Sequence, residues 1–373
     1  MEEQALTEEL IRYDTSREEG VKLCAGFVKG WLEARDIEAR QVGVRDLPVT
    51  MAEVGPADAE ITLLLHGHID VVPALPEQFE PRVDGERLYG RGAYDMKGAL
   101  AALLLAFADV REVDGIRVRL GIVPDEESEE EEDERGAARL VSSGFVGDFA
   151  ITGEPTDMHV GVAAKGVLAM RLAVSGRAAH GATPWLGENA ILHAYDVFRQ
   201  LESLPFASES SALFDRPSIN LGRILGGDAL NKVPDACVID VDVRYLPEQN
   251  PDSILAQVRE LPRVELVSSF SRAPVLVDPN SPFVRALRTA AAPHSEGEVR
   301  DVVGRDGASD AATLLRAGVA TVEFGPHGGG HHGPEEWVSI PSLASYRQSI
   351  VDYVQSLPGA LGAEAGEAEE TAR

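Results

Sequence analysis

The sequence contains little cysteine, little lysine and no long apolar run. Its two cysteines, Cys24 and Cys237, lie far apart in a predicted helix and a predicted strand, which excludes a disulfide framework and a zinc site built on paired cysteines. Nowhere do about 18 apolar residues follow one another, as a membrane-spanning helix requires. The first residues, MEEQALTEEL, lack the basic and apolar parts of a signal peptide. We therefore expect a soluble, cytoplasmic protein without membrane partners.

Positive charge is also scarce. The chain has 34 lysines and arginines, only five of them lysines, against 62 aspartates and glutamates, and its formal net charge is −28. A field of this sign repels phosphate backbones, so nucleic acid is a poor candidate partner. At 373 residues, of which 44% are hydrophobic, the chain is long enough for two domains, and disorder of the whole chain is excluded.

The larger predicted domain is of the α/β class. Its signal is a set of short, nearly continuous apolar runs, which are typical of strands covered on both faces. Helical periodicity lies between some of these runs, as in 98–110, and the segment 8–34 predicts two helices with a turn near 15–20. The pattern predicts a largely parallel sheet. The runs are 61–65, 118–123, 149–152 and 320–324.

A different pattern occupies residues 166–273. Strand, helix, two strands, helix and strand follow one another there, which is the order of a ferredoxin-like unit. Because α/β-type strands resume afterwards, we expect this unit to be inserted into a discontinuous domain formed by 1–165 and 274–357. The tail, 358–373, combines low hydrophobicity with glycine, alanine and glutamate, and we expect it to be disordered.

The first candidate site residues follow the strand 61–65. The segment HGHIDVVP places His68 and Asp70 at the carboxyl end of that strand, where sites form in open α/β sheets. A metal-bound imidazole whose other nitrogen is held by a carboxylate fits this pair. A histidine that only hydrogen-bonds a loop fits it too.

The second candidate is Asp95, in the glycine-rich segment YGRGAYDMKG before a helix rich in alanine and leucine. Neither phosphate-binding glycine motif is matched there. Two interpretations remain open for Asp95, a metal ligand or a helix cap.

Carboxylates follow two further predicted strands, the pair Glu126 and Glu127 after 118–123 and Glu154 after 149–152. Extended backbone points Glu126 and Glu127 in different directions, so that one can bind a metal while the other faces the attacking water as a general base. The rest of the acidic run, 129–134, is typical of a solvated loop or helix start, although a docking surface for a basic partner is a further interpretation. Glu154 follows the strand 149–152 and is either a ligand or a loop residue.

The last candidate segment is GPHGGGHHGPEEWV, with His327, His331 and His332 after the strand 320–324. Four strand ends and the glycine-rich segment of Asp95 thus each present a histidine or a carboxylate. Such a set suits a pair of hydrolytic metal ions that share one aspartate and keep open positions for water.

In this order the motifs resemble those of the M20 metallopeptidase family, which includes acetylornithine deacetylases, succinyl-diaminopimelate desuccinylases, aminoacylases and glutamate carboxypeptidases. The resemblance extends from about residue 8 to residue 355. It implies a dizinc α/β catalytic domain and an inserted ferredoxin-like lid that also forms a homodimer.

The resemblance also assigns roles residue by residue. It implies that His68 and Glu154 bind a first zinc, that Glu127 and His332 bind a second zinc, and that the carboxylate of Asp95 bridges the two ions. It further implies that Glu126 is the general base that passes a proton from water to the leaving amine, and that Asp70 orients His68. The family pattern His-x-x-x-Glu selects His332 over His331.

Three lid residues are implied in the same way. The segment SGRAAHGATPWLGENAI resembles the motif of a histidine that reaches the neighbouring subunit's site, where His180 would stabilise the oxyanion. The segment LNKVPDACVIDVDVRYLP would supply Asn231 and Arg244 to the substrate carboxylate, and the fork of an arginine suits that task. For His180 a surface-loop histidine, and for Arg244 a surface ion pair, are the alternatives.

Two departures from the family pattern bear on the details. After Asp125-Glu126-Glu127 the family usually has a glycine-rich stretch, whereas this chain has SEEEEDERGA, which leaves the ligand register open. Where the desuccinylase branch carries basic and polar residues, this chain has Ala164 and Val167 around Lys165, which speaks against a succinyl substrate.

The resulting hypothesis is a metal-dependent amidohydrolase that cleaves an N-acyl-amino acid beside a free carboxylate, with zinc, cobalt or manganese as the metal. A dipeptidase or carboxypeptidase of the same chemistry is the alternative. An inactive metal-binding scaffold is disfavoured, because all six ligand and base positions are filled.

Overall fold

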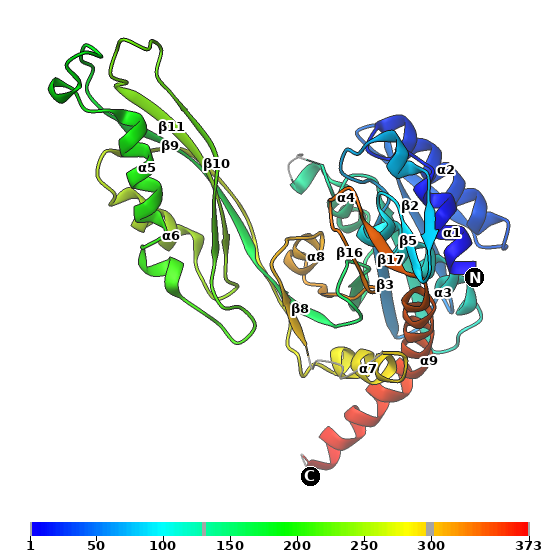
Figure 1. Cartoon of the computed structure of the whole chain (residues 1–373). Coiled ribbons are helices and arrows are strands. Elements are labelled where there is room, and N and C mark those ends of the chain that lie inside the picture. The colour runs from blue at the N-terminus through cyan, green and yellow to red at the C-terminus, as the bar shows by residue number, and fades with distance from the viewer. Residues whose placement is uncertain (1, 129–131, 296–301, 372–373) are drawn as a thin grey trace. The chain divides into compact units, whose positions relative to one another are not determined.

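The computed structural model describes residues 2–128, 132–295 and 302–371 (Figure 1). The chain forms two compact units. The first contains Met1–Val162, Val277–Val303 and Ser309–Arg373, and the second contains Ala163–Leu276 and Gly304–Ala308. The sequence prediction gave 166–273 for the inserted unit and did not include residues 304–308 in it.

The main sheet of the first unit runs in the order β1-β2-β6-β3-β7-β15-β8. Its central strands β6, β3, β7 and β15 are parallel, whereas β1, β2 and β8 join it antiparallel. The sheet is therefore mixed, and the expected parallel arrangement holds only at its centre. The strands are β1 (Ala39–Val44), β2 (Leu47–Val54), β3 (Ile61–His68), β6 (Ile116–Val123), β7 (Phe149–Thr152), β8 (Gly161–Ala164) and β15 (Ala320–Glu323).

Helices cover both faces of this sheet (Figure 1). On one face α3 packs beside α1 and α9, and a Cβ added at Gly67 of β3 would meet Leu100 of α3. On the other face α4 packs against β6, where Leu140 lies over Gly121 and Leu64. The helices of the unit are α1 (Glu2–Ile11), α2 (Glu18–Glu33), α3 (Gly98–Asp109), α4 (Gly136–Ser142), α7 (Pro282–Ala291), α8 (Ala311–Arg316) and α9 (Ile340–Thr371).

A second, small antiparallel sheet of the first unit has the order β16-β17-β5-β4. Its strands are β4 (Arg82–Asp84), β5 (Arg87–Tyr89), β16 (Gly328–Gly329) and β17 (Trp337–Ser339). The pairing of Trp337 with Tyr89 and of Val338 with Leu88 brings two distant segments side by side. One segment precedes Asp95 and the other carries the last histidines, so this ladder places two predicted ligand loops together.

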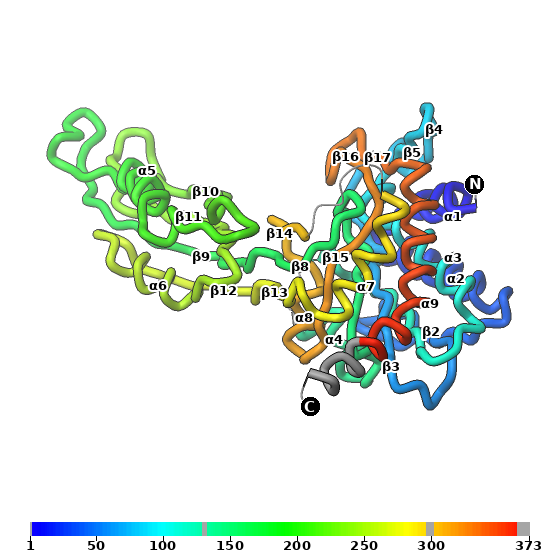
Figure 2. The backbone as a smooth tube through the Cα atoms, turned by 90° about the horizontal axis from the view of Figure 1, so that it is seen from below, coloured from blue at the N-terminus to red at the C-terminus, as the bar shows by residue number. Residues whose placement is uncertain are grey.

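The second unit has the predicted βαββαβ order. Its antiparallel sheet runs β10-β11-β9-β12, and α5 and α6 lie on one face of it (Figure 2). Alternate residues of β9, from Leu168 to Val174, point into the core beneath the helices. The elements are β9 (Gly166–Ser175), α5 (Ala190–Leu201), β10 (Ser218–Gly226), β11 (Ala236–Tyr245), α6 (Pro251–Arg259) and β12 (Val264–Arg272). Two further short strands, β13 (Val275–Leu276) and β14 (Val303–Arg305), both pair with β8.

The tail differs from its expected disorder. Helix α9 continues through Pro358 to Thr371, and residues 372–373 lie outside the described part of the chain. Low hydrophobicity removes packing energy, but alanine and glutamate remain strong helix formers, so the local preference of this stretch is helical. Among the described residues, no helix combines the length and apolar character that crossing a bilayer requires.

We predict that Leu103→Ala lowers the free energy of unfolding by about 2–5 kcal/mol, because Leu103 of α3 is fully buried and its truncation leaves a cavity. The matched control is Leu23→Ala on α2, where the side chain is 58% exposed and the change should stay below about 0.5 kcal/mol. Urea-induced unfolding of both variants measures the difference. Equal losses would contradict the buried position of α3.

Candidate metal centre

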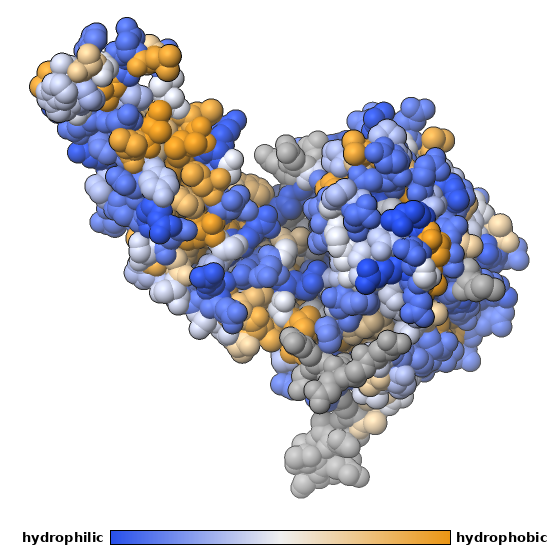
Figure 3. Space-filling view, in the orientation of Figure 1, coloured by the Kyte–Doolittle hydropathy of each residue, from blue (hydrophilic) through white to orange (hydrophobic). Residues whose placement is uncertain are grey.

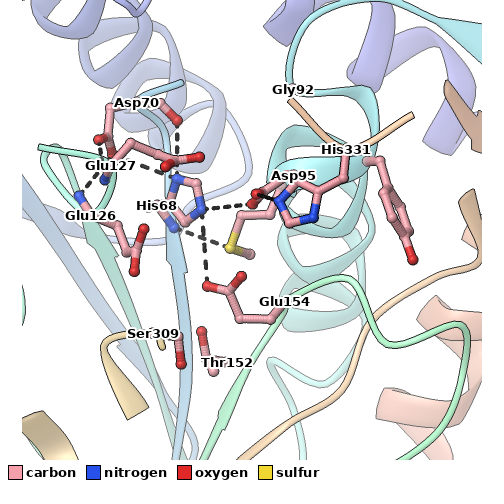
Figure 4. Close-up of polar contacts among 12 residues, drawn as sticks. His68, Asp70, Gly92, Asp95, Glu126, Glu127, Thr152, Glu154, Ser309 and His331 are labelled. Carbon is pink, nitrogen blue, oxygen red and sulfur yellow. Dashed lines mark hydrogen bonds and ion pairs between the residues drawn. The ribbon is translucent and has the colours of Figure 1, made fainter. Parts of the chain in front are cut away.

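The predicted ligands of the first unit converge at the carboxyl ends of its parallel strands. His68 is the last residue of β3, and Glu126 and Glu127 follow β6 after a proline and an aspartate. Glu154 comes two residues after β7. Because these strands are parallel neighbours, their ends meet at one edge of the sheet. Asp95 reaches the same place from the turn before α3 (Figure 4).

The first group of ligands consists of His68, Asp95 and Glu154, all buried. The Nε2 atom of His68 lies 3.1 Å from Oδ1 of Asp95 and 3.9 Å from Oε1 of Glu154. The ligand atoms of the three residues lie within 4.8 Å of one another. Oε1 of Glu154 is buried and has no hydrogen-bond partner within the described chain. A cation at this position would satisfy it, so the donor set fits a metal ion.

The second group uses the other oxygen of Asp95. Its Oδ2 lies 2.5 Å from Nε2 of His331 and 3.3 Å from Nε2 of His332. His332 also lies 2.8 Å from Oε1 of Glu127. Both histidines approach Asp95, and His332 also pairs with Glu127. Asp95 thus faces both groups with separate oxygens, as a bridging carboxylate would.

Asp70 contacts His68, its predicted partner, and also the backbone of Glu126 and Glu127. The Nδ1 atom of His68 lies 3.0 Å from the Asp70 carbonyl oxygen and 3.5 Å from its carboxylate. The carboxylate itself accepts hydrogen bonds from the backbone nitrogens of Glu126, at 3.1 Å, and Glu127, at 2.8 Å (Figure 4). One residue therefore orients the first histidine and fixes the backbone that carries the predicted base.

Hydrogen bonds hold the start of the acidic run. Asp125 is buried, and its carboxylate accepts hydrogen bonds from Arg45, at 2.9 Å, and from the backbone of Gly136, at 2.8 Å. Arg135 donates to the carbonyl oxygens of Glu126, at 2.7 Å, and of Ser128. These contacts turn Asp125 away from the ligand groups and leave Glu126 and Glu127 toward them. Of the run 129–134, residues 129–131 lie outside the described chain.

The electrostatics of the site reflect crowded carboxylates. Burial raises the pKa of Glu126 well above its usual range, and the negative charge of Asp310 adds to the rise. Burial acts in the same direction on the pKa of Glu154, as does the charge of Asp95. Burial alone would lower the pKa of His68, but hydrogen bonds to Asp70 and Asp95 outweigh it and raise that pKa. Bound cations would relieve this crowding.

A buried histidine–aspartate pair near the site was not predicted. Nε2 of His66 lies 3.4 Å from Oδ2 of Asp310, and both residues are almost completely buried. Beside them, the hydroxyl of Ser309 donates to Glu323 at 2.6 Å. The alternation of side chains along a strand could have indicated His66, because residues two apart, such as His66 and His68, lie on the same face of β3. No comparable pattern marks Asp310.

The three predicted residues of the second unit fall into two places. His180 and Asn231 lie on neighbouring exposed loops, joined by a hydrogen bond of 2.7 Å from the Gly181 nitrogen to the Asn231 carbonyl. Arg244 lies near the other end of β11 and pairs with Asp242 at 3.0 Å. Within this unit, the structure thus brings His180 and Asn231 together but not Arg244.

Comparison with known proteins identifies the family. The sequence profile of peptidase family M20/M25/M40 matches residues 64–356, so the chain belongs to this family. A Staphylococcus aureus (strain MSSA476) protein named "Probable succinyl-diaminopimelate desuccinylase" is 26% identical over an alignment of 388 positions, gaps included, which covers 91% of this chain and 94% of that protein.

Two solved structures share the fold. Aminopeptidase PepT from Bacillus cereus superposes with a TM-score of 0.79 at 17% identity, over 95% of this chain and 98% of that one. The Bacillus subtilis YXEP protein, described as a dinuclear metal-binding peptidase of the M20 family, has a TM-score of 0.66 at 17% identity, over 95% of this chain and 99% of its own. The chain is thus an M20-family hydrolase, and the family confirms the resemblance seen in the motifs.

We predict that Glu154→Gln stabilises the metal-free protein at neutral pH by about 1–3 kcal/mol, because it removes a buried charge whose Oε1 atom has no hydrogen-bond partner among the described residues. The gain should shrink as the pH falls, since the raised pKa of Glu154 then lets the wild-type carboxylate take up a proton. Urea-induced unfolding in the presence of a chelator measures both effects. Glu335→Gln, at a side chain that is 75% exposed, is the control. A loss of stability in the Glu154 variant would contradict the prediction.

Proposed function

We propose that the protein is a two-metal amidohydrolase that cleaves the amide bond of an N-acyl-amino acid beside a free carboxylate. The observation that carries the proposal is the position of Asp95, whose two oxygens face separate ligand groups. His68 and Glu154 would complete one metal site, and Glu127 and His332 the other. Two imidazoles and three carboxylates suit zinc, with cobalt and manganese as alternatives.

Glu126 is the proposed general base. Bound metal ions would lower the pKa of a water molecule and polarise the substrate carbonyl. Glu126 is half-buried and its pKa is raised by desolvation and neighbouring carboxylates, so it can accept the proton of the attacking water and deliver it to the leaving amine. Its backbone is held by Asp70 and by Arg135, which keeps the carboxylate beside His68 (Figure 4).

The substrate class draws support from the relatives. The name of the Staphylococcus aureus relative denotes removal of a succinyl group from an amino acid, which is an N-acyl-amino acid reaction. Peptides are the alternative class of substrate, because a solved aminopeptidase has the same fold. In the second unit, Asn231 and Arg244 are the proposed ligands of the substrate carboxylate, and His180 is the proposed donor to the oxyanion. Lys165 is buried, and its Nζ atom lies 2.7 Å from the carboxylate of Asp306, so its charge is already paired within that unit.

We predict that Glu126→Gln lowers kcat by about a hundredfold or more while both metal ions stay bound, because it removes the proton carrier but no ligand. The assay is hydrolysis of N-acetylornithine, N-succinyl-diaminopimelate, other N-acyl-amino acids and simple dipeptides, together with metal content by mass spectrometry. Glu134→Gln, later in the acidic run, is the control and should retain activity.

The panel separates the alternatives. Cleavage of acyl-amino acids by wild type supports the proposed substrate class, whereas cleavage of dipeptides alone supports the peptidase alternative. A chain that binds two ions and cleaves neither class would overturn the substrate proposal. A chain that binds none would overturn the metal centre.

We also propose a homodimer formed through the second unit. Large apolar side chains are exposed on the α5 and β10 side of this unit (Figure 3). Leu192 and Tyr195 of α5 are 63% and 56% exposed, and Leu225 of β10 is 54% exposed. An apolar surface of this kind suits contact with a second copy of the chain. The exposed loop position of His180 is compatible with action in the partner's site.

Mixed dimers provide the test. We predict that dimers of one His180→Ala chain and one Glu126→Gln chain, isolated through two different affinity tags, recover about half of the wild-type rate. The reason is that the chain with an intact Glu126 receives His180 from its partner, so one of the two sites is complete. Each parent dimer should be nearly inactive. Mixed dimers without recovered activity would contradict action of His180 across the interface.

A further inference from the structure

Arg91 and Glu336 form a buried ion pair behind the metal centre. Their side chains are 3% and 1% exposed, and Nη1 of Arg91 lies 2.5 Å from Oε2 of Glu336. Burying two charges costs desolvation energy that the pair alone hardly recovers, and apolar residues of similar size often stabilise a fold equally well. The other contacts of the two side chains therefore indicate what the pair does.

Glu336 holds the backbone of the segment that carries Asp95. Its Oε1 accepts hydrogen bonds of 3.0 Å from the nitrogens of Tyr94 and Asp95, and its Oε2 accepts one of 3.1 Å from Gly92. Gly92 has φ +80°, a left-handed conformation that turns the chain toward the carboxylate. With Arg91 included, Glu336 accepts four hydrogen bonds, which uses the full capacity of a carboxylate. It is therefore a partner of the backbone and not a metal ligand.

Arg91 holds the other ligand loop. Its Nη2 donates to the carbonyl oxygens of His332, at 3.0 Å, and Gly333, at 3.2 Å. A continuous path of hydrogen bonds thus runs from the nitrogen of Asp95 through Glu336 and Arg91 to the carbonyl of His332. The two ends of this path are residues whose side chains lie 3.3 Å apart at the proposed second metal site.

We infer that Arg91 and Glu336 are positioning residues that set the spacing between Asp95 and His332 before a metal ion binds. The inference rests on the proposed two-metal function. The ladder between β5 and β17 already holds the two loops together at Tyr89 and Trp337. Loss of the pair should therefore leave the fold in place and shift the ligands, so that the second metal ion is held less tightly.

The test compares Glu336→Gln, Arg91→Met and Arg91→Lys with wild type. Calorimetric titration of the metal-free proteins with Co²⁺, together with the absorption spectrum of the bound cobalt, reports the ligand geometry directly. We expect Glu336→Gln and Arg91→Met to weaken the second equivalent by about 10–100-fold and to change the cobalt spectrum. The value of kcat should fall by a similar factor, with KM changed less than about threefold. Arg91→Lys, which keeps the charge but not the fork, should recover part of the loss.

Arg347→Met is the matched control. Arg347 pairs with Asp109 at 2.7 Å and with Glu3 at 2.7 Å in the same unit, so its loss removes an ion pair elsewhere and should leave Co²⁺ binding unchanged. Variants of the Arg91–Glu336 pair that are less stable but bind both ions with wild-type affinity and spectrum would overturn the inference alone. Wild-type protein that binds fewer than two ions would overturn the proposed function and this inference with it.

Discussion

The position of Asp95 between two groups of proposed metal ligands is the constraint on which the proposed metal centre depends. Each oxygen of this buried carboxylate faces imidazole nitrogens, so Asp95 keeps both groups in register only if its own backbone cannot shift. Glu336 supplies that restraint from behind, through the nitrogens of Tyr94 and Asp95. Helix α3 begins directly after this turn, and its residues from Gly98 to Phe107 are all buried, which anchors the segment in the core.

The same edge of the sheet concentrates negative charge that folding alone does not neutralise. Glu126 and Glu154 have raised pKa values because burial and neighbouring carboxylates oppose their ionisation. The hydrophobic core offsets this cost, since the strands that deliver these residues are buried along most of their length. A site that is poorly neutralised without its ions is a strong binder of cations, because binding removes an existing repulsion.

Sequence alone was enough to predict that several of the proposed ligands converge. His68 and Glu154 follow apolar strands, and the carboxyl ends of parallel strands meet at one edge, so their convergence with Glu127 follows from the pattern. The hydrogen bonds of the Asp70 carboxylate to the backbone of Glu126 and Glu127 could not be foreseen, because backbone donors leave no trace in residue type. The antiparallel edges of the sheet and the helical end of α9 were missed for related reasons, since apolar runs do not encode direction and low hydrophobicity does not exclude helix.

The discontinuity of the first unit has a consequence for biosynthesis. His68, Asp95, Glu127 and Glu154 all precede the second unit in the chain, whereas His332 and Glu336 follow it. A nascent chain that has just completed the second unit therefore holds the ligands of the first proposed site but lacks the histidine of the second. It also lacks β15, the strand that pairs with β7 at the centre of the sheet. In chain order, every residue of the second unit thus precedes β15, and the histidine of the second proposed site follows that strand.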